Sequence, residues 1–389
     1  MRRTAVATPA VPVVPVRVDP APTAMVWIEA GRPHEAVAVP GVALAPGDAL
    51  VEVELATICG SDVHTTQGHR STPTPVVLGH EQVGRVVAVR DGAVTADGLP
   101  LDVGDRVVWS LTVACGTCSA CCRGLPQKCA TVRKYGHERL VTGWELSGGF
   151  ATHVHLRAGT AIVPVDPALD ARVLAPVSCG TATAAAALHA AESVTEIAGG
   201  AVVVFGAGLI GLTLCAMATD RGARVVVVDP DRHRRELAVR FGAVATADPR
   251  ARRAGESLSR ALEAFDEGPA AAFDASGAPR AVASAIECVR VGGVAVLIGS
   301  VFPTDAVPLD PESVVRRLVT IRGVHNYAPA QLTEAVRFAE ARSAVYPLAD
   351  LVGATVPLSD LDAGIAAAAR GTAVRVGVVP DARSTRAAG

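Results

Sequence analysis

The segment AVVVFGAGLIGLTLCAMATDRGARVVVVD, residues 201–229, constrains the fold more than any other part of the sequence. An apolar run typical of a buried strand leads through Gly206, Gly208 and Gly211 into a helical pattern, and a second apolar run ends at Asp229. Glycines at this spacing allow a tight turn and let the backbone approach a pyrophosphate, which a helix N-terminus stabilises. The segment therefore predicts an α/β domain with a doubly wound parallel sheet that binds a dinucleotide.

The acid at the end of the second strand indicates which dinucleotide is bound. Asp229 can accept hydrogen bonds from both ribose hydroxyls and would repel a 2′-phosphate, so NAD is favoured over NADP. The arginines at 232, 234 and 235 weaken that preference, because a nearby arginine can accept a 2′-phosphate. We expect the cofactor contacts at Gly206, Gly208, Leu209, Ile210, Gly211, Asp229 and Arg234.

A second motif, CGTCSACCRGLPQKC, has the spacing of a metal site. Its cysteines follow C-x2-C-x2-C-x7-C at Cys115, Cys118, Cys121 and Cys129. Four thiolates in a short polar segment match a closed tetrahedral zinc site, which leaves no open position for a substrate and is therefore structural. The adjacent Cys122 should point away from the metal, although register alone does not exclude an exchange with Cys121.

A third, dispersed set contains Cys59 in CGSDVH, and His80 with Glu81 in LGHEQVG. A cysteine, a histidine and a carboxylate on separate loops could form a catalytic zinc site with three protein ligands and one open position. By themselves these residues carry little weight, since a cysteine after a strand more often belongs to the core. Metal-binding cysteines must be reduced, which predicts a reducing compartment and a cytoplasmic location.

The rest of the chain divides by pattern. We expect a disordered tail at 1–24, because prolines interrupt its apolar residues; a β-barrel domain at 25–178 with the four-cysteine lobe at 112–132; the dinucleotide domain at 179–330; and a return to the first domain at 331–389. The net charge of −2 gives no reason to expect nucleic acid as a partner, and no apolar run is long enough to span a membrane.

In order and spacing, these motifs together resemble the zinc-dependent medium-chain alcohol dehydrogenases. The resemblance covers roughly residues 25–380 and includes CGSDVH, GHEQVGRV, LDVGDRVV, the four-cysteine lobe, GGFATHV and GAGLIG. It implies a chaperonin-10-like β-barrel catalytic domain and a Rossmann domain, two zinc ions per chain, an NAD-linked oxidation of an alcohol or the reverse reduction, and a homodimer or homotetramer.

The resemblance also implies individual roles. Cys59 and His80 would bind the catalytic zinc, and Asp62 would orient His80. Ser61 would contact the substrate hydroxyl, and His64 would pass its proton to solvent. Arg375 falls where the family places a pyrophosphate-binding arginine, whereas Gly60 stands where some members carry another, so that contact must be absent or replaced.

The remaining zinc ligand of the family falls in LAPVSCGT, where alignment through the proline gives Ala175. Alanine cannot bind metal. Three possibilities stay open: Cys179 is the ligand; Glu81 coordinates directly and Cys179 lines the nicotinamide pocket; or Cys179 is an inert buried thiol.

Several segments, among them RGLPQKC, RKYGHE and WELSGGFATHVHL, resemble a subgroup associated with phosphonate metabolism. This implies a hydroxyalkylphosphonate or phosphonoacetaldehyde as substrate, with a polyol, amino alcohol or simple alcohol as the alternative. A non-catalytic protein that keeps the fold is a further alternative. An anionic substrate needs cationic or polar partners, and the candidates, each also explicable as ordinary surface or loop structure, are Arg70, Arg133, Lys134, His137, His325, Asn326 and Tyr327.

Overall fold

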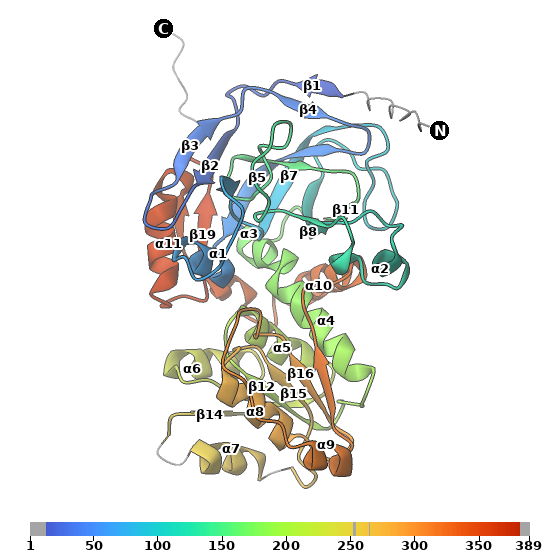
Figure 1. Cartoon of the computed structure of the whole chain (residues 1–389), viewed down its shortest axis with the longest axis vertical. Helices are drawn as coiled ribbons and strands as arrows, with labels where there is room; N and C mark the ends of the chain where they lie inside the picture. The colour runs from blue at the N-terminus through green and yellow to red at the C-terminus, as the bar shows by residue number, and fades with distance from the viewer. Residues whose placement is uncertain (1–12, 252–253, 264, 382–389) are drawn as a thin grey trace, which may run out of the picture.

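The computed structural model describes residues 13–381 apart from 252–253 and 264. It has two lobes, one built mainly of strands and one built of a parallel sheet covered by helices (Figure 1). Both N-terminal and C-terminal segments contribute to the strand-rich lobe, whereas the middle of the chain forms the other. This is the predicted pairing of a β-barrel domain with a doubly wound α/β domain.

The strand-rich lobe is organised around the long strand β5, which pairs antiparallel with β7, β10 and β19. Its eight-stranded sheet has the order β11-β8-β7-β5-β19-β18, with β10 on β5 and β9 on β8, and smaller sheets pair β1 with β4 and join β3, β2 and β6. The strands of this lobe are β1 Val14–Val16, β2 Thr23–Trp27, β3 Glu35–Ala38, β4 Val42–Leu44, β5 Ala49–Thr57, β6 Val76–Val77, β7 Gln82–Val89, β8 Arg106–Val113, β9 Arg133–Lys134, β10 His153–Leu156, β11 Thr160–Pro164, β18 Val352–Pro357 and β19 Arg375–Val379. Its helical segments are α1 Gly60–Thr66, α2 Ser119–Cys122, η1 Pro126–Lys128, α3 Ala171–Leu174, η2 Ala175–Ser178, η3 Leu348–Leu351, η4 Leu358–Asp360 and α11 Leu361–Ala369.

The expected disordered tail at 1–24 is wrong for its second half. Val14–Val16 pairs with β4, and β2 already begins at Thr23. Pro15 is tolerated because β1 belongs to a two-stranded ribbon in which a missing N–H costs little. Val16 and Val18 pack on a small apolar cluster that includes Leu44, so burial orders this segment. Residues 1–12 lie outside the described residues.

The second lobe holds a six-stranded sheet in the order β14-β13-β12-β15-β16-β17, in which every pair is parallel. Its central strand β12 is buried along its whole length, as expected for a sheet with both faces covered. The strands are β12 Ala201–Phe205, β13 Arg224–Val228, β14 Ala245–Ala247, β15 Pro269–Asp274, β16 Val294–Leu297 and β17 Thr320–Gly323. The helices are α4 Gly180–Glu192, α5 Leu209–Asp220, α6 Arg232–Arg240, α7 Ala254–Leu262, α8 Pro279–Cys288, α9 Pro311–Arg317 and α10 Pro329–Arg342.

The two lobes share one continuous apolar core. It runs from Leu55 and Val108 of the barrel through α4 and α5 to Val204 of the parallel sheet. The chain returns to the barrel through β18 and β19, which are the predicted strands ATVPL and VRVGVV. Residue 331, the predicted start of this return, lies inside α10, whose buried face belongs to the shared core.

No single helix in the described ranges has the length and apolar composition to cross a membrane. One bent pair, residues 171–178 with 180–192, meets those criteria when both parts are counted together.

Candidate metal and dinucleotide sites

The four cysteines of the lobe converge on one point. The sulfur of Cys118 lies 3.5 Å from that of Cys121 and 3.9 Å from that of Cys129, and the sulfurs of Cys129 and Cys115 are 3.4 Å apart. All four sulfurs lie within 4.8 Å of one another. A closed set of four thiols at this separation suits a tetrahedral zinc ion, whose bonds to sulfur are about 2.3 Å long.

Backbone N–H groups point at these sulfurs, as expected where thiolates must be stabilised. The N–H of Cys118 donates to the Cys115 sulfur at 3.3 Å, and the N–H of Ala130 donates to the Cys118 sulfur at 3.4 Å. Hydrogen bonds from the backbone of Thr117 and Cys118 lower the pKa of Cys115 to about 5. Cys122 instead directs its thiol to the carbonyl of Thr117 at 3.4 Å, so the structure places it outside the cluster.

The second cluster is assembled by strand register. Because β7 and β19 flank β5 antiparallel, the end of β5 lies beside the starts of both neighbours. Cys59 follows β5 as the residue before α1, His80 and Glu81 immediately precede β7, and Arg375 begins β19. Backbone bonds from Thr57 to Glu81 and from Ile58 to Val376 hold these ends together.

Donor atoms of Cys59, His80, Glu81 and Cys179 all lie within 4.8 Å of one another. Two thiols, an imidazole and a carboxylate are ligand types that zinc accepts, so this set fits the metal as well as the lobe does. Cys179 comes from the break between η2 and α4, whereas Ala175, buried in η2, offers no donor. The structure therefore brings Cys179 into the site.

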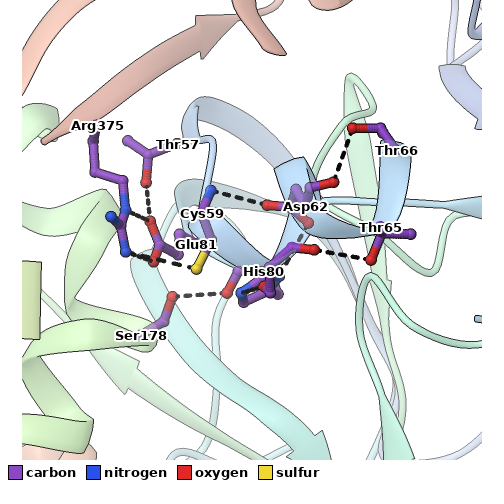
Figure 2. A network of polar contacts seen from close by, with 10 residues as sticks. Thr57, Cys59, Asp62, Thr65, Thr66, His80, Glu81, Ser178 and Arg375 are labelled. Atoms are coloured by element: carbon purple, nitrogen blue, oxygen red, sulfur yellow. Dashed lines mark hydrogen bonds and ion pairs between the residues drawn. The ribbon is translucent and has the colours of Figure 1, made fainter. Parts of the chain in front are cut away.

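Around these donors, α1 supplies one set of supporting contacts (Figure 2). The Asp62 carboxylate accepts the Cys59 N–H at 2.9 Å, and its other oxygen lies 3.5 Å from Nδ1 of His80. Asp62 raises the pKa of His80 against the opposing effect of burial. The Ser61 hydroxyl lies 3.4 Å from Nε2 of His80, and the exposed His64 packs against Phe302 with ring centroids 4.7 Å apart and ring planes tilted by 51°.

The Glu81 carboxylate forms an ion pair with the guanidinium of Arg375. The guanidinium donates to both carboxylate oxygens, at 2.7 and 2.8 Å, and the Thr57 hydroxyl donates a third bond at 2.6 Å (Figure 2). Arg375 also lies 3.6 Å from the Cys59 sulfur. Burial raises the pKa of Glu81 while Arg375 lowers it. The predicted pyrophosphate contact of Arg375 would require this ion pair to open.

The glycine loop has the geometry that a pyrophosphate needs. Gly206 has φ +98°, a conformation that side chains rarely adopt, and a Cβ on Gly211 would lie 1.7 Å from the carbonyl oxygen of Gly206. Gly208 precedes the first residue of α5, so the helix N-terminus is directed at the loop. Leu209 is buried and Ile210 partly buried, which leaves their backbone to face a cofactor.

Asp229 lies where the sequence indicates, at the end of β13. Its carboxylate accepts the N–H of Ala207 at 2.7 Å and that of Asp231 at 2.8 Å, which fixes it beside the glycine loop. Of the three following arginines, Arg235 bonds the Asp229 carbonyl and Arg232 pairs with Glu236. Arg234 instead reaches the Gly371 carbonyl at 3.3 Å and passes close to Gly208.

One contact joins the buried metal cluster to the glycine loop. A Cβ on Gly180, the residue after Cys179, would lie 2.3 Å from a side-chain carbon of Leu209 in the loop. The start of α4 and the start of α5 are therefore in direct contact. A nicotinamide that follows a pyrophosphate at the loop thus has a short path to the metal donors.

Sequence reasoning missed Asp274, a buried acid at the end of β15. It accepts the hydroxyl of Ser276 at 2.7 Å and the N–H of Gly277 at 3.1 Å, and so shapes the loop opposite Gly206. The signal that could have found it is the pattern FDASG, an acid directly after an apolar strand and before a turn.

The proposed contacts for an anionic substrate do not all converge. The Arg133 guanidinium lies over the Trp144 ring, and Tyr327 is buried with its hydroxyl bonded to the Ser178 carbonyl. Asn326 lines a cleft beside the lobe, and His137 packs against His80 with ring centroids 4.9 Å apart and ring planes tilted by 37°. Besides burial, the positive charges of Lys128 and Arg70 lower the pKa of both Lys134 and His325. Lys128 is not among the residues singled out from the sequence.

Comparison with known proteins agrees with this assembly. Residues 45–167 match the alcohol dehydrogenase GroES-like domain, and residues 210–341 match the zinc-binding dehydrogenase domain. The chain is 32% identical to geraniol dehydrogenase of Castellaniella defragrans over 73% of its length and 78% of that protein. It is 31% identical to D-altritol 5-dehydrogenase of Agrobacterium fabrum over 87% of its length and 93% of that protein.

A solved alcohol dehydrogenase from Thermotoga maritima superposes with a TM-score of 0.85 at 29% identity, covering 92% of this chain and 99% of that one. The fold, the two donor clusters and these matches define a zinc-dependent oxidoreductase of alcohols. The chain belongs to the zinc-dependent medium-chain alcohol dehydrogenase family.

Proposed function

We propose that this protein catalyses NAD-linked interconversion of an alcohol with its aldehyde or ketone at the cluster formed by Cys59, His80 and Cys179. The observation that carries the proposal is the gathering of these donors beside Ser61, at the end of α4 that touches the glycine loop. Asp229 supports NAD as the cofactor, because its carboxylate faces the loop where a 2′-phosphate would be repelled.

Cys179 rather than Glu81 completes the ligand set in this proposal. Arg375 and Thr57 already occupy the Glu81 carboxylate with three hydrogen bonds, whereas the Cys179 thiol is directed at Cys59. When bound, zinc supplies Lewis acidity that lowers the pKa of a substrate hydroxyl, and the nicotinamide accepts the hydride.

Ser61 and His64 form the proposed route by which the proton of the substrate hydroxyl reaches solvent. Ser61 is positioned to take the hydroxyl proton, because its oxygen lies 3.4 Å from His80 on the side of the donor cluster. His64 is exposed one turn along α1, where it can exchange a proton with solvent. Asp62 keeps His80 oriented through the 3.5 Å contact at Nδ1.

The narrower proposal for the substrate is a hydroxyalkylphosphonate or phosphonoacetaldehyde. Cations near His137 support a negatively charged substrate. The relatives carry names that refer to geraniol, D-altritol and L-threonine, so they also support the alternative of an uncharged polyol or an amino alcohol.

We also propose a cytoplasmic location and a homo-oligomeric assembly for the protein. The free thiols of both clusters suit a reducing, cytoplasmic environment. We propose a homo-oligomer formed through the parallel-sheet domain, whose outer strand β17 ends the sheet and exposes Ile321. An uncovered sheet edge with an apolar side chain is a natural surface for a second copy.

The test is a steady-state assay of purified enzyme with NAD and with NADP against phosphonate-bearing and plain alcohols, alongside zinc analysis. We expect two zinc ions per chain, a preference for NAD and a measurable oxidation of at least one alcohol. A preference for NADP would contradict the role given to Asp229. The absence of alcohol oxidation by the fully metallated protein would contradict the function itself.

A further inference from the structure

A cleft with a volume of about 860 Å³ lies between the four-cysteine lobe, α4 and residues 322–328. Its wall includes Gln127, Lys128, Ser300, Arg322, His325 and Tyr327. The lobe is thus one side of a cavity and not an isolated structural appendage. A cavity of this volume is large enough for a small organic substrate.

Two basic side chains, Lys128 of the lobe and His325, line this cleft together. The ammonium group of Lys128 lies 2.5 Å from Nδ1 of His325. Partial burial, together with the positive charges of Lys128, Lys134 and Arg70, lowers the pKa of His325 to about 4. Burial likewise lowers the pKa of Lys134, with Lys128 and Arg70 as the nearby positive charges. Four basic side chains from three separate segments therefore share one region.

These cations are not neutralised by ion pairs. Among the residues that the structure describes, no carboxylate lies within ion-pair distance of Arg70, Lys128 or Lys134. Glu138, the one acid acting on Lys134, accepts its backbone N–H at 3.0 Å. Clustered like charges raise the free energy of the folded protein unless a ligand of opposite charge compensates them.

The basic region connects directly with the buried donor cluster. The His137 ring lies 4.9 Å from the His80 ring, and its backbone N–H bonds the Lys134 carbonyl at 3.2 Å. Nδ1 of His137 is buried and has no hydrogen-bond partner. A molecule whose hydroxyl lies at His80 could therefore extend past His137 toward Lys134 and Lys128.

We propose that Lys128, Lys134, Arg70 and His325 form a subsite for a doubly charged oxyanion on the substrate, a phosphonate or phosphate monoester. This inference rests on the proposed function and makes the four-cysteine lobe an element of substrate recognition. Lys128 ends η1 and directly precedes Cys129, one of the four lobe cysteines. A metal held by the lobe cysteines would fix the backbone from which Lys128 reaches His325.

The test compares Lys128→Met and Lys134→Met with the matched control Arg133→Met. Arg133 is adjacent to Lys134 but lies over Trp144. Substrates of similar size are 2-hydroxyethylphosphonate, 2-hydroxyethyl phosphate and uncharged 1-butanol, each with NAD. Direct binding of methylphosphonate is measured by calorimetry on the zinc-loaded protein, so one readout does not depend on turnover.

We expect each lysine variant to raise KM for the charged alcohols roughly 10- to 100-fold, as for loss of a hydrogen bond to a charged group. The KM for 1-butanol should change less than threefold, and Arg133→Met should behave as the unsubstituted enzyme. Methylphosphonate binding should weaken in parallel. Equal KM changes for charged and uncharged alcohols, or unchanged KM for all, would overturn the subsite.

Two outcomes separate this inference from the proposed function. Oxidation of 1-butanol without any preference for charged alcohols sinks the subsite and leaves the dehydrogenase function intact. Methylphosphonate binding that depends on Lys128 in a protein that oxidises none of the alcohols supports the subsite and counts against the proposed function. A response to 2-hydroxyethyl phosphate but not to the phosphonate identifies a phosphate monoester as the ligand.

Discussion

The two cysteine clusters of this protein are built in opposite ways. The lobe takes its four sulfurs from residues 115–129, and they are partly accessible apart from the buried Cys129. The second cluster, called the cleft cluster from here on and distinct from the cavity beside the lobe, takes Cys59, His80, Glu81 and Cys179 from segments far apart in the chain. His80 and Glu81 are fully buried. One site depends on local spacing and the other on the register of β5, β7 and β19.

This contrast separates the roles of the two sites. Four sulfurs close a coordination sphere, so a metal in the lobe has no open position for a substrate. In the cleft cluster, Arg375 and Thr57 bond the Glu81 carboxylate. In the proposed function, two thiols and an imidazole would then hold the zinc and leave one position for a substrate. The predictions that follow test this division, beginning with the largest effect.

The largest effect is expected from Cys59→Ser. A serine hydroxyl is a poor zinc ligand, so the bound zinc should fall from two ions per chain to one. The rate constant kcat should fall at least about a thousandfold, because the metal contributes several kcal/mol to catalysis. Zinc analysis and steady-state kinetics on the same sample measure both quantities.

The control for this variant is Cys215→Ser, which changes a buried thiol of α5 outside both clusters. It should retain two zinc ions. A Cys59→Ser protein that keeps two zinc ions and its kcat would remove the cleft cluster from the mechanism.

The next effect distinguishes Cys179 from Glu81. Cys179→Ser should lose most of the cleft zinc and lower kcat roughly a hundredfold, with little change in thermal stability. Glu81→Gln should keep the zinc but leave the buried Arg375 without its carboxylate, at a cost of about 3–5 kcal/mol in the free energy of unfolding. Cys179→Ser should therefore show the larger loss of zinc, and Glu81→Gln the larger loss of thermal stability.

The reverse pattern, zinc lost in Glu81→Gln and kept in Cys179→Ser, would assign direct coordination to Glu81. Cys179 would then line the nicotinamide pocket, and NADH binding followed by fluorescence should weaken in its variant.

How far the sequence predicts each site follows from the same contrast. The lobe motif predicts its ligands because its spacing alone brings the sulfurs together, and GAGLIG predicts its turn because only glycine fits at Gly206 and Gly211. The prediction that Cys59 and His80 converge rests mainly on the family resemblance, because their separation along the chain does not determine the register of the strands.

Other features depend on tertiary packing that no local pattern encodes. The pairing of Arg375 with Glu81 joins residues 294 positions apart. Lys128 contacts His325, 197 positions away in the sequence. Val14–Val16 looked disordered because prolines surround it, and only the partner strand β4 orders it. Alternation and turn residues predicted the type of each domain, but not these contacts.

A smaller effect on catalysis, but a clear one on stability, is expected from Cys118→Ser in the lobe. Loss of the lobe zinc should cost about 3 kcal/mol, which lowers Tm by roughly 4 °C in a chain of this size. The value of kcat for an uncharged alcohol should fall less than about tenfold, because no lobe sulfur belongs to the cleft cluster. Differential scanning calorimetry with zinc analysis checks the stability, and kinetics checks the separation.

A fall in kcat for the uncharged alcohol of more than about tenfold, with little change in Tm, would contradict the division of roles between the two sites. It would mean that the lobe supports the chemistry directly.

The smallest effect is expected from Cys122→Ser. The Cys122 thiol is exposed and directed at the Thr117 carbonyl, 3.4 Å away, while the four neighbouring cysteines close the metal sphere without it. Zinc content, Tm and kcat should therefore match those of the unsubstituted protein, and a serine hydroxyl can keep the bond to Thr117. Loss of one zinc ion from this variant would show that Cys122 exchanges with Cys121 as a ligand. The local spacing that predicts the lobe would then fail at this position, and the lobe would depend on its folded context as the cleft does.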